Sequence, residues 1–338
     1  AFIDGQMLSS IVLAALQVIT AIILAFWAPG FHTITSEKDE EALKNARQSI
    51  PASLMDALDK AATQRHLLVA TDFDGTLAPL VRNPRKAAPI PGSLEALDTL
   101  ATIPHTKAAI VSGRDIAGLR KVAPVTRDVT LVGSHGAEIS DSDHELTKHQ
   151  RDLLKRLIEE VTQTADSIPG ATIEEKKYAV VLHTRTAQDP HEAKKRTVEL
   201  EERLSAVPGV TLTRGKKVSE FAVINTTKDA ALASLAARWP TGADAILYLG
   251  DDVTDEHIFT GLPARITTPQ TEIITVKVGE GDTAAQYRIA NELEAAAVLD
   301  YLCEQRNHYA NAHFTWKDRK QHRKDSRSRA RRMAYSAD

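Results

Sequence analysis

The chain has 338 residues, of which 43% are hydrophobic and 26% are charged, so it can bury a sizeable core and would ordinarily divide into two domains. Its one cysteine, Cys303, excludes an internal disulfide and a metal cluster held by cysteines, and is typical of a reducing compartment. The formal net charge of −3 combines an acidic body with a basic tail, because residues 317–332 contain nine Lys or Arg and two Asp.

The N-terminal residues 7–27, MLSSIVLAALQVITAIILAFW, carry no charge and are apolar on nearly all sides. About 20 such residues can cross a bilayer, so the segment predicts a membrane anchor. No basic residue precedes it and no A-x-A pattern follows it, which argues against a secretory signal peptide. The nearest basic residues lie on its C-terminal side, which would leave the rest of the chain in the cytoplasm. A buried helix and upstream sequence outside the working protein are the alternatives.

The body of the chain begins with a strand, a helix and a second strand. Residues 35–50 are polar and are expected to form a linker that runs into a helix near 52–63. Short apolar runs at 66–72 and 106–113 predict strands, and the stretch PGSLEALDTLAT between them has the proline start and the apolar spacing of a helix. This order predicts parallel β-α-β units.

The pattern changes after about residue 140 and resumes near residue 223. Charged amphipathic helices are expected at 146–166 and 190–205, together with a hairpin in ATIEEKKYAVVLHTR and further strands at 209–213 and 217–223, which predicts an α+β insert. The expected fold class is α/β, with a Rossmann-like parallel-sheet core and an inserted α+β cap. The expected parts are an N-terminal segment with a linker (1–50), a first core part (51–139), the cap (140–222), a second core part (223–306) and a basic, disordered tail (307–338).

Chemically useful side chains follow four of the predicted core strands. They are Asp72, Asp74, Ser112, Lys228, Asp251, Asp252 and Asp255. Ligands of parallel sheets lie beyond the carboxyl ends of the strands, so these groups are expected at one edge. Clustered carboxylates are costly unless a hard cation such as Mg²⁺ neutralises them, and that cation would attract a phosphate. A carboxylate that attacks phosphorus would form an acyl phosphate.

Each of these residues also has a structural explanation when taken alone. An Asp at a strand end often caps the next helix, Ser112 is placed to do the same, and Lys228 stands where a solvated helix start is expected. The pattern D-x-D-G-T followed by G-D-x-x-x-D, each after an apolar strand, is not explained in this way.

The motifs DFDGTL, VSGR, a later Lys and GDDVTDE resemble those of the haloacid dehalogenase superfamily of aspartate-nucleophile phosphatases. More specifically, GSHGAE (133–138), IEEKKYAVVLHTR (173–185), GKKVSEFAV (215–223) and YLGDDVTDEHIF (248–259) resemble trehalose-6-phosphate phosphatases. The similarity runs from about residue 55 to 306. It implies hydrolysis of trehalose 6-phosphate to trehalose and phosphate, the last step of trehalose biosynthesis, and a functional link to a trehalose-6-phosphate synthase.

The resemblance implies a role for each core residue. Asp72 is similar to the nucleophile, and Asp74 to the general acid and base. Ser112 and Lys228 resemble the pair that holds the phosphate.

The Mg²⁺ ligands implied by the resemblance are the Asp72 carboxylate, the Asp74 carbonyl and Asp251, with Asp252 in the same set. Asp252 and Asp255 are also suited to act through water or by orienting Lys228.

Sugar recognition is expected from the cap. Glu174 and Lys176 align with the Glu-x-Lys that contacts the distal glucose in this family, and Glu220 aligns with a third sugar-binding carboxylate. Without the resemblance, these charges would be explained as a solvated hairpin edge. Further substrate-binding candidates are Gly75, Arg114, Ser134, His135, Gly136 and Arg185.

Two departures from the family pattern place local details in question. Asp229 stands where the family usually has Gly, and Ala222 and Val223 stand where it usually has Arg-Pro.

Three other functions remain open from the sequence: a phosphatase for another sugar phosphate, a non-catalytic regulatory partner of a trehalose-synthesising enzyme, and a membrane-tethered scaffold. The basic tail is expected to be solvated, with anionic lipid or nucleic acid as alternative partners. No aromatic stacking platform accompanies it, so specific nucleic-acid recognition is not expected.

Overall fold

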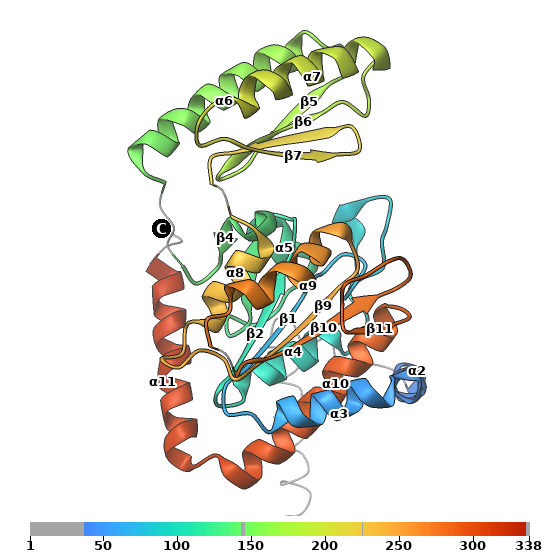
Figure 1. Ribbon diagram of the computed structural model, residues 1–338, viewed down its shortest axis with the longest axis vertical. Helices are drawn as coiled ribbons and strands as arrows, with labels where there is room; N and C mark the ends of the chain where they lie inside the picture. The colour runs from blue at the N-terminus through green and yellow to red at the C-terminus, as the bar shows by residue number, and fades with distance from the viewer. Residues whose placement is uncertain (1–36, 143–145, 225, 269, 336–338) are drawn as a thin grey trace, which may run out of the picture.

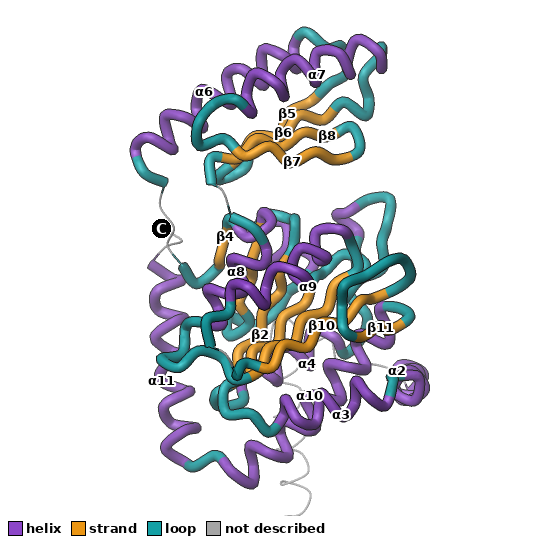
Figure 2. The backbone as a smooth tube through the Cα atoms, in the orientation of Figure 1, coloured by secondary structure: helices purple, strands orange, loops and turns teal. Residues whose placement is uncertain are grey.

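The computed structural model describes residues 37–335 except 143–145, 225 and 269. These residues form a core lobe, in which helices cover both faces of a large sheet, and a smaller cap lobe (Figure 1, Figure 2). The apolar segment 7–27 lies outside the described residues. Within the described part of the chain, no helix combines the length and the apolar character needed to span a membrane.

The core sheet has the strand order β11-β10-β9-β1-β2-β3-β4 and is parallel except for its edge strand β4. Its strands are β1 (Leu67–Thr71), β2 (Thr106–Val111), β3 (Thr130–Gly133), β4 (Glu138–Ile139), β9 (Ala245–Gly250), β10 (Glu272–Val278) and β11 (Tyr287–Ile289). Every residue of β1 is buried, as expected for a strand covered on both faces. In the register of the sheet, Thr71 lies beside Ile110 of β2 and Leu249 of β9. The three strands therefore end at the same edge.

Helices pack on both faces of this sheet. One face is covered by α3 (Ala52–Ala62), α4 (Ser93–Thr102), α5 (Ile116–Val122) and α10 (Glu292–His313). The other face is covered by α8 (Lys228–Ala236) and α9 (Val253–Arg265), which lie side by side in Figure 1. Both α8 and α9 begin at the edge where the central strands end, and each carries one candidate catalytic residue in its first turn.

The cap lobe is an antiparallel sheet with two helices on one face. It contains α6 (Lys148–Asp166), β5 (Thr172–Glu175), β6 (Ala179–His183), α7 (Pro190–Ser205), β7 (Thr211–Gly215) and β8 (Val218–Ala222), with strand order β5-β6-β8-β7. Alternate strand residues such as Val180 and Phe221 pack against α6 and α7 residues such as Leu157. The opposite face of the sheet is turned towards the core lobe (Figure 1).

Two polar segments are helices, contrary to the sequence prediction. The expected linker forms α2 (Glu37–Ser49), whose Leu43 and Ala46 are buried in the core cluster that contains α10. These two buried side chains dock α2 against the core, although most of its other residues are polar.

The basic tail, expected to be disordered, forms α11 (Trp316–Tyr335) along one side of the core lobe (Figure 1). The His105 ring contacts the Asp318 carboxylate at 2.8 Å, the His322 ring contacts the Ala101 carbonyl at 3.0 Å, and Ser326 hydrogen-bonds to Asp128. The prediction of disorder was therefore wrong, because polar contacts dock a helix whose composition is dominated by solvated charges.

Candidate active site

The turn after β1 places Asp72 at the centre of the common edge. The Asp72 main-chain N–H donates to the Leu249 carbonyl at 2.9 Å, so the β1 to β9 ladder continues through this residue. Gly75 has φ of +85°, and a Cβ at this position would lie 2.0 Å from the Asp251 carboxylate. Gly75 therefore allows the turn to approach Asp251, and its predicted place at the site has a steric basis.

Asp72 and Lys228 form a buried ion pair. The Lys228 Nζ lies 2.7 Å from Asp72 Oδ1 and 2.8 Å from Asp255 Oδ1, and all three side chains are at most 7% exposed. Burial alone would lower the pKa of Lys228, but the charges of Asp72 and Asp255 outweigh it and raise that pKa above its ordinary value. Lys228 is thus a fixed cation beside the predicted nucleophile.

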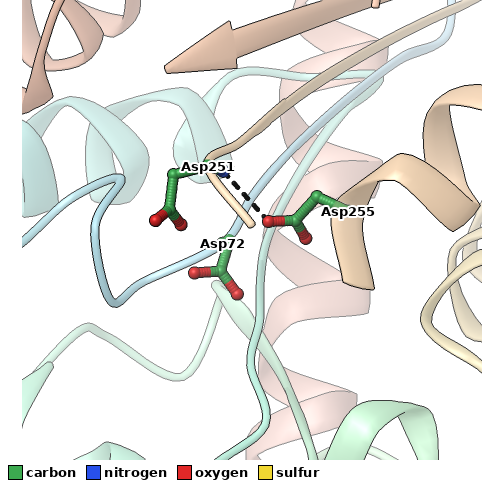
Figure 3. Close-up of side chains that lie close together, drawn as sticks. All are labelled: Asp72, Asp251 and Asp255. Atoms are coloured by element: carbon green, nitrogen blue, oxygen red, sulfur yellow. Dashed lines mark hydrogen bonds between the residues drawn. The ribbon is translucent and has the colours of Figure 1, made fainter. Parts of the chain in front are cut away.

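Three carboxylates converge at this edge, as Figure 3 shows. Asp72, Asp251 and Asp255 each offer an oxygen, and these oxygens lie within 4.8 Å of one another. Burial, and then the charges of Asp255 and Asp252, raise the pKa of Asp251 to about 7. Burial also raises the pKa of Asp72 well above its ordinary value, although Lys228 opposes this effect. A divalent cation would relieve this repulsion, and an all-oxygen donor set suits Mg²⁺.

The converging group contains Asp255 and not Asp252, and Asp255 contacts Lys228 at 2.8 Å, in line with the predicted role of orienting that lysine. Asp252 caps α9, because its Oδ1 accepts from the N–H groups of Thr254 at 2.8 Å and Asp255 at 3.2 Å. The prediction of Asp252 as a direct metal ligand is therefore not supported by the geometry, and its cap role matches the structural explanation for an Asp before a helix.

Asp74 pairs with Arg114, one of the predicted substrate-binding residues. The Arg114 Nε donates to Asp74 Oδ2 at 2.6 Å, and a second guanidinium nitrogen donates to Asp74 Oδ1. This two-point pairing raises the pKa of Arg114 and fixes the direction of the Asp74 carboxylate. Arg114 therefore positions the predicted general acid and base in this structure.

A cavity of about 480 Å³ opens at this edge of the core. It is lined by Asp72, Asp74, Leu80, Val81, Pro84, Ser112, Gly113, Arg114, His135, Lys228, Asp251, Asp252 and Thr254. Leu80 and Val81 are 72% and 44% exposed, and the sequence analysis did not identify them. With Pro84 they give an apolar wall to a cavity that also carries several charged residues, which suits a ligand with both phosphate and carbon surface.

Of the three candidates at 134–136, only His135 lines the cavity. The Ser134 hydroxyl donates to Glu138 Oε1 at 2.6 Å, so it is engaged within the turn. Gly136 has φ of +107°, and a Cβ there would lie 2.7 Å from the Thr227 carbonyl. These two residues support the turn and its packing against the start of α8, so the geometry does not support direct substrate contacts for them.

The cap candidates lie on the sheet face that is turned towards the core. Glu174 is opposite Val181, and Val181 is opposite Glu220, so both glutamates occupy one row of the same face. Lys176 Nζ pairs with Glu220 Oε2 at 2.6 Å, and Glu174 contacts the His183 ring at 3.1 Å. Burial, and then the charge of Lys228, lower the pKa of His135, whereas the charge of Glu220 acts to raise it. Arg185 is exposed in the turn after β6.

The departures from the family pattern have local partners. Asp229 lies in the first turn of α8 and pairs with Arg265 at the end of α9, which ties the two helices together. Val223 is buried in the hydrophobic core of the cap.

Two further residues contact the acidic group and were not predicted. The Tyr248 hydroxyl donates to Asp255 Oδ1 at 2.7 Å, and the buried Lys277 donates to the main-chain carbonyl of Asp251. Each stands among apolar residues in a strand, in AILYLG and EIITVKV. A polar side chain in an otherwise apolar buried strand is the signal that would have found them.

A parallel sheet with this acidic edge and an inserted cap defines a protein of the haloacid dehalogenase superfamily, which confirms the predicted fold class. The sequence model described as trehalose-phosphatase matches residues 70–292. The chain belongs to the trehalose-phosphatase family.

Individual relatives agree with the family. The chain is 30% identical to a trehalose-phosphate phosphatase of Mycobacterium tuberculosis, covering 82% of this chain and 72% of that protein. It is 33% identical to an uncharacterized glycosyl hydrolase of the same species, covering 72% of this chain but only 19% of that protein. The structure of an Aspergillus fumigatus trehalose-6-phosphate phosphatase matches with a TM-score of 0.56 and 28% identity, covering 75% of this chain and 97% of that chain.

Proposed function

We propose that the chain is a Mg²⁺-dependent phosphatase that hydrolyses trehalose 6-phosphate to trehalose and phosphate through an aspartyl-phosphate on Asp72. The observation that carries the proposal is the buried contact of Lys228 with Asp72 at 2.7 Å, next to Asp251 and at the wall of a cavity at the edge of the core sheet. Family membership supports the same reaction and the same substrate.

In the first step, an oxygen of Asp72 forms a bond to phosphorus while the bond between phosphorus and the sugar oxygen breaks. Lys228 holds Asp72 Oδ1, which leaves Oδ2 to attack. Asp74, in its protonated form and with one of its two Arg114 contacts released, gives that proton to the departing sugar oxygen. Ser112 and Arg114 line the cavity where phosphate oxygens would lie. Bound Mg²⁺, held by Asp72, Asp251 and the Asp74 carbonyl, would supply positive charge that offsets the charge of the phosphoryl group.

In the second step, Asp74 takes a proton from water, and the water oxygen forms a bond to phosphorus. The bond between phosphorus and Asp72 breaks, so phosphate leaves and the Asp72 carboxylate is restored. Arg114 keeps Asp74 directed into the cavity during this exchange. Closure of the cap over the cavity would exclude bulk water from the intermediate.

The distal sugar is assigned to the cap face. Lys176 and Glu220 are largely buried and paired with each other, and their remaining donors and acceptors can serve sugar hydroxyls. Glu174 in the same row extends that surface. A trehalose-6-phosphate synthase as the source of the substrate stays a prediction.

Phosphate release from trehalose 6-phosphate, compared with glucose 6-phosphate and phosphoglycolate, tests the proposal. We expect trehalose 6-phosphate to be hydrolysed with the highest kcat/KM and activity to disappear in EDTA and return with Mg²⁺. Equal rates on all three substrates would remove the substrate assignment and leave the chemistry standing.

A further inference from the structure

Tyr248 is a buried polar side chain that the two proposed steps do not use. It lies in β9, its ring packs edge-on to Phe259 with centroids 6.1 Å apart, and its side chain is fully buried. Its hydroxyl reaches the Asp255 Oδ1 at 2.7 Å. A buried phenol normally needs a hydrogen-bond partner, and here that partner is the carboxylate that also holds Lys228.

The Asp255 carboxylate receives four hydrogen bonds. Oδ1 accepts from Tyr248 at 2.7 Å and from Lys228 at 2.8 Å. Oδ2 accepts from the main-chain N–H groups of Asp251 at 3.0 Å and Asp252 at 3.1 Å. Each oxygen therefore has two donors, which uses the acceptor capacity of an ionised carboxylate.

The same carboxylate lies close enough to take part in metal binding. One oxygen of Asp255 lies within 4.8 Å of oxygens of Asp72 and Asp251, and Figure 3 shows the three side chains directed into a common space. Asp255 can thus either accept a hydrogen bond from Lys228 or bind a cation. A carboxylate oxygen that already accepts two hydrogen bonds is a poor metal ligand, and an oxygen that has lost one of them is a better ligand.

We propose that Tyr248 is a positioning residue that holds Asp255 on Lys228 and keeps it from becoming a metal ligand. The proposal rests on the proposed function, since it takes Lys228 as the partner of the nucleophile Asp72. Loss of the phenol hydroxyl removes one of the two donors on Oδ1. Asp255 can then turn towards Asp251, and Lys228 loses the anchor that fixes it against Asp72.

The environment of Tyr248 suits a permanent donor. Burial, and then the charges of Asp255 and Asp72, raise the pKa of its phenol well above the ordinary value, so the hydroxyl keeps its proton across the working pH range. The ring is held by the apolar cluster that includes Ile246 and Phe259. The direction of the hydroxyl is therefore set by the packing of the ring.

The test is Tyr248→Phe, which keeps the ring and removes only the hydroxyl. We expect kcat on trehalose 6-phosphate to fall roughly tenfold, which is the loss of one hydrogen bond to a charged group, with KM within about twofold of the wild type. We also expect the metal-free variant to bind Mg²⁺ roughly three to ten times more tightly in calorimetry, since Asp255 joins the ligands. Tyr301→Phe is the matched control, because it removes a phenol hydroxyl that donates at 2.6 Å to Asp59 of α3, which is not part of the acidic group, and it should change neither quantity.

Unchanged or weaker Mg²⁺ binding in Tyr248→Phe, or the same changes in Tyr301→Phe, would overturn the proposal. If Tyr248→Phe does not fold, Asp255→Asn tests the proposal instead, because it changes the acceptor of the same hydrogen bond. In Asp255→Asn, kcat should fall and Mg²⁺ binding should not become tighter. Tighter Mg²⁺ binding in this variant would overturn the proposal. Mg²⁺ binding is measured without substrate. A wild-type protein that is inactive on trehalose 6-phosphate would therefore reject the proposed function and leave this test standing.

Discussion

The edge of the core sheet and the face of the cap sheet both carry charged residues, but they hold them differently. At the core edge, Lys228 and Asp255 are at most 4% exposed and each contacts more than one fixed partner. On the cap face, the Lys176 and Glu220 side chains are 11% and 14% exposed, and Glu174 is 50% exposed. The difference indicates that the groups proposed for phosphoryl transfer are arranged before substrate binds, whereas the groups proposed for sugar recognition keep more contact with solvent, Glu174 most of all.

The two regions also differ in the free-energy cost of holding their charged groups together. Burial raises the pKa values of Asp72 and Asp251, so the core edge holds carboxylates against their own repulsion. The cap charges are instead paired with opposite charges: Lys176, just after β5, pairs with Glu220 of β8 across the intervening strand β6. Substitutions at the core edge should therefore lower the rate of hydrolysis of every substrate. Substitutions on the cap face should lower it only for substrates that contact the cap.

The largest expected effect is that of Asp72→Asn. We expect turnover of every phosphate ester to fall at least about 10³-fold, because the amide is a far weaker nucleophile, while the thermal melting curve stays close to that of the wild type. Phosphate release and circular dichroism measure the two quantities. Asp282→Asn, in the exposed loop before β11, is the matched control and should keep full activity. Substantial activity in Asp72→Asn would remove Asp72 from the role of nucleophile.

The second effect separates the cap from the core. Lys176→Ala or Glu220→Gln should lower kcat/KM for trehalose 6-phosphate roughly 10- to 100-fold, because the partner left behind is unpaired in a largely buried site. Hydrolysis of p-nitrophenyl phosphate, which has no second sugar, should stay within about threefold. Glu202→Gln, exposed on α7, serves as the control. Equal losses on both substrates would contradict the division of roles.

A third prediction concerns the pH dependence of the core edge without metal. The pKa of Asp251 is about 7 in the folded protein, so the folded state binds more protons than the unfolded state between about pH 4 and 7. The free energy of unfolding in EDTA should therefore fall as pH rises through that window, by about 2 kcal/mol after discounting for partial exposure. Urea denaturation measures it. Asp251→Asn should reduce the slope, and a slope of opposite sign would contradict the assignment.

The smallest expected effect is that of Glu174→Gln. Glu174 is more exposed than Lys176 or Glu220 and contacts only the His183 ring among the polar partners described. We expect kcat/KM for trehalose 6-phosphate to fall about two- to fivefold, in the same assay. A loss as large as that of Glu220→Gln would show that the cap closes further over the substrate than exposure in this structure indicates.

Much of the site followed from the sequence because its motifs stand at predictable strand ends. Asp72, Asp74 and Asp251 were placed by apolar runs that end in carboxylates, and parallel strands bring such ends to one edge. The distinction between Asp252 and Asp255 did not follow. Helix α9 turns Asp255 inward, and Asp252 caps its N-terminus. The rotation of the helix about its axis decides which side chain faces the site, and spacing along the chain does not show that rotation.

The residues that sequence reasoning missed act through contacts between distant segments. Tyr248 and Lys277 stand in apolar strands, and their partners become evident only when β9, β10 and α9 are assembled. Helices α2 and α11 were assigned to a linker and a disordered tail because their composition is polar. Leu43 docks α2 through apolar packing, and Asp318 and His322 dock α11 through polar contacts. A prediction from hydrophobic periodicity gives little weight to a single apolar residue or to polar contacts.

The most direct test of this division is the ratio of kcat/KM for trehalose 6-phosphate to that for glucose 6-phosphate, measured in the wild type and in Lys176→Ala. The account predicts a wild-type preference for trehalose 6-phosphate of at least about 100-fold, most of which disappears in the variant, while kcat/KM for glucose 6-phosphate changes little. A preference that survives in Lys176→Ala, or is absent in the wild type, would contradict it.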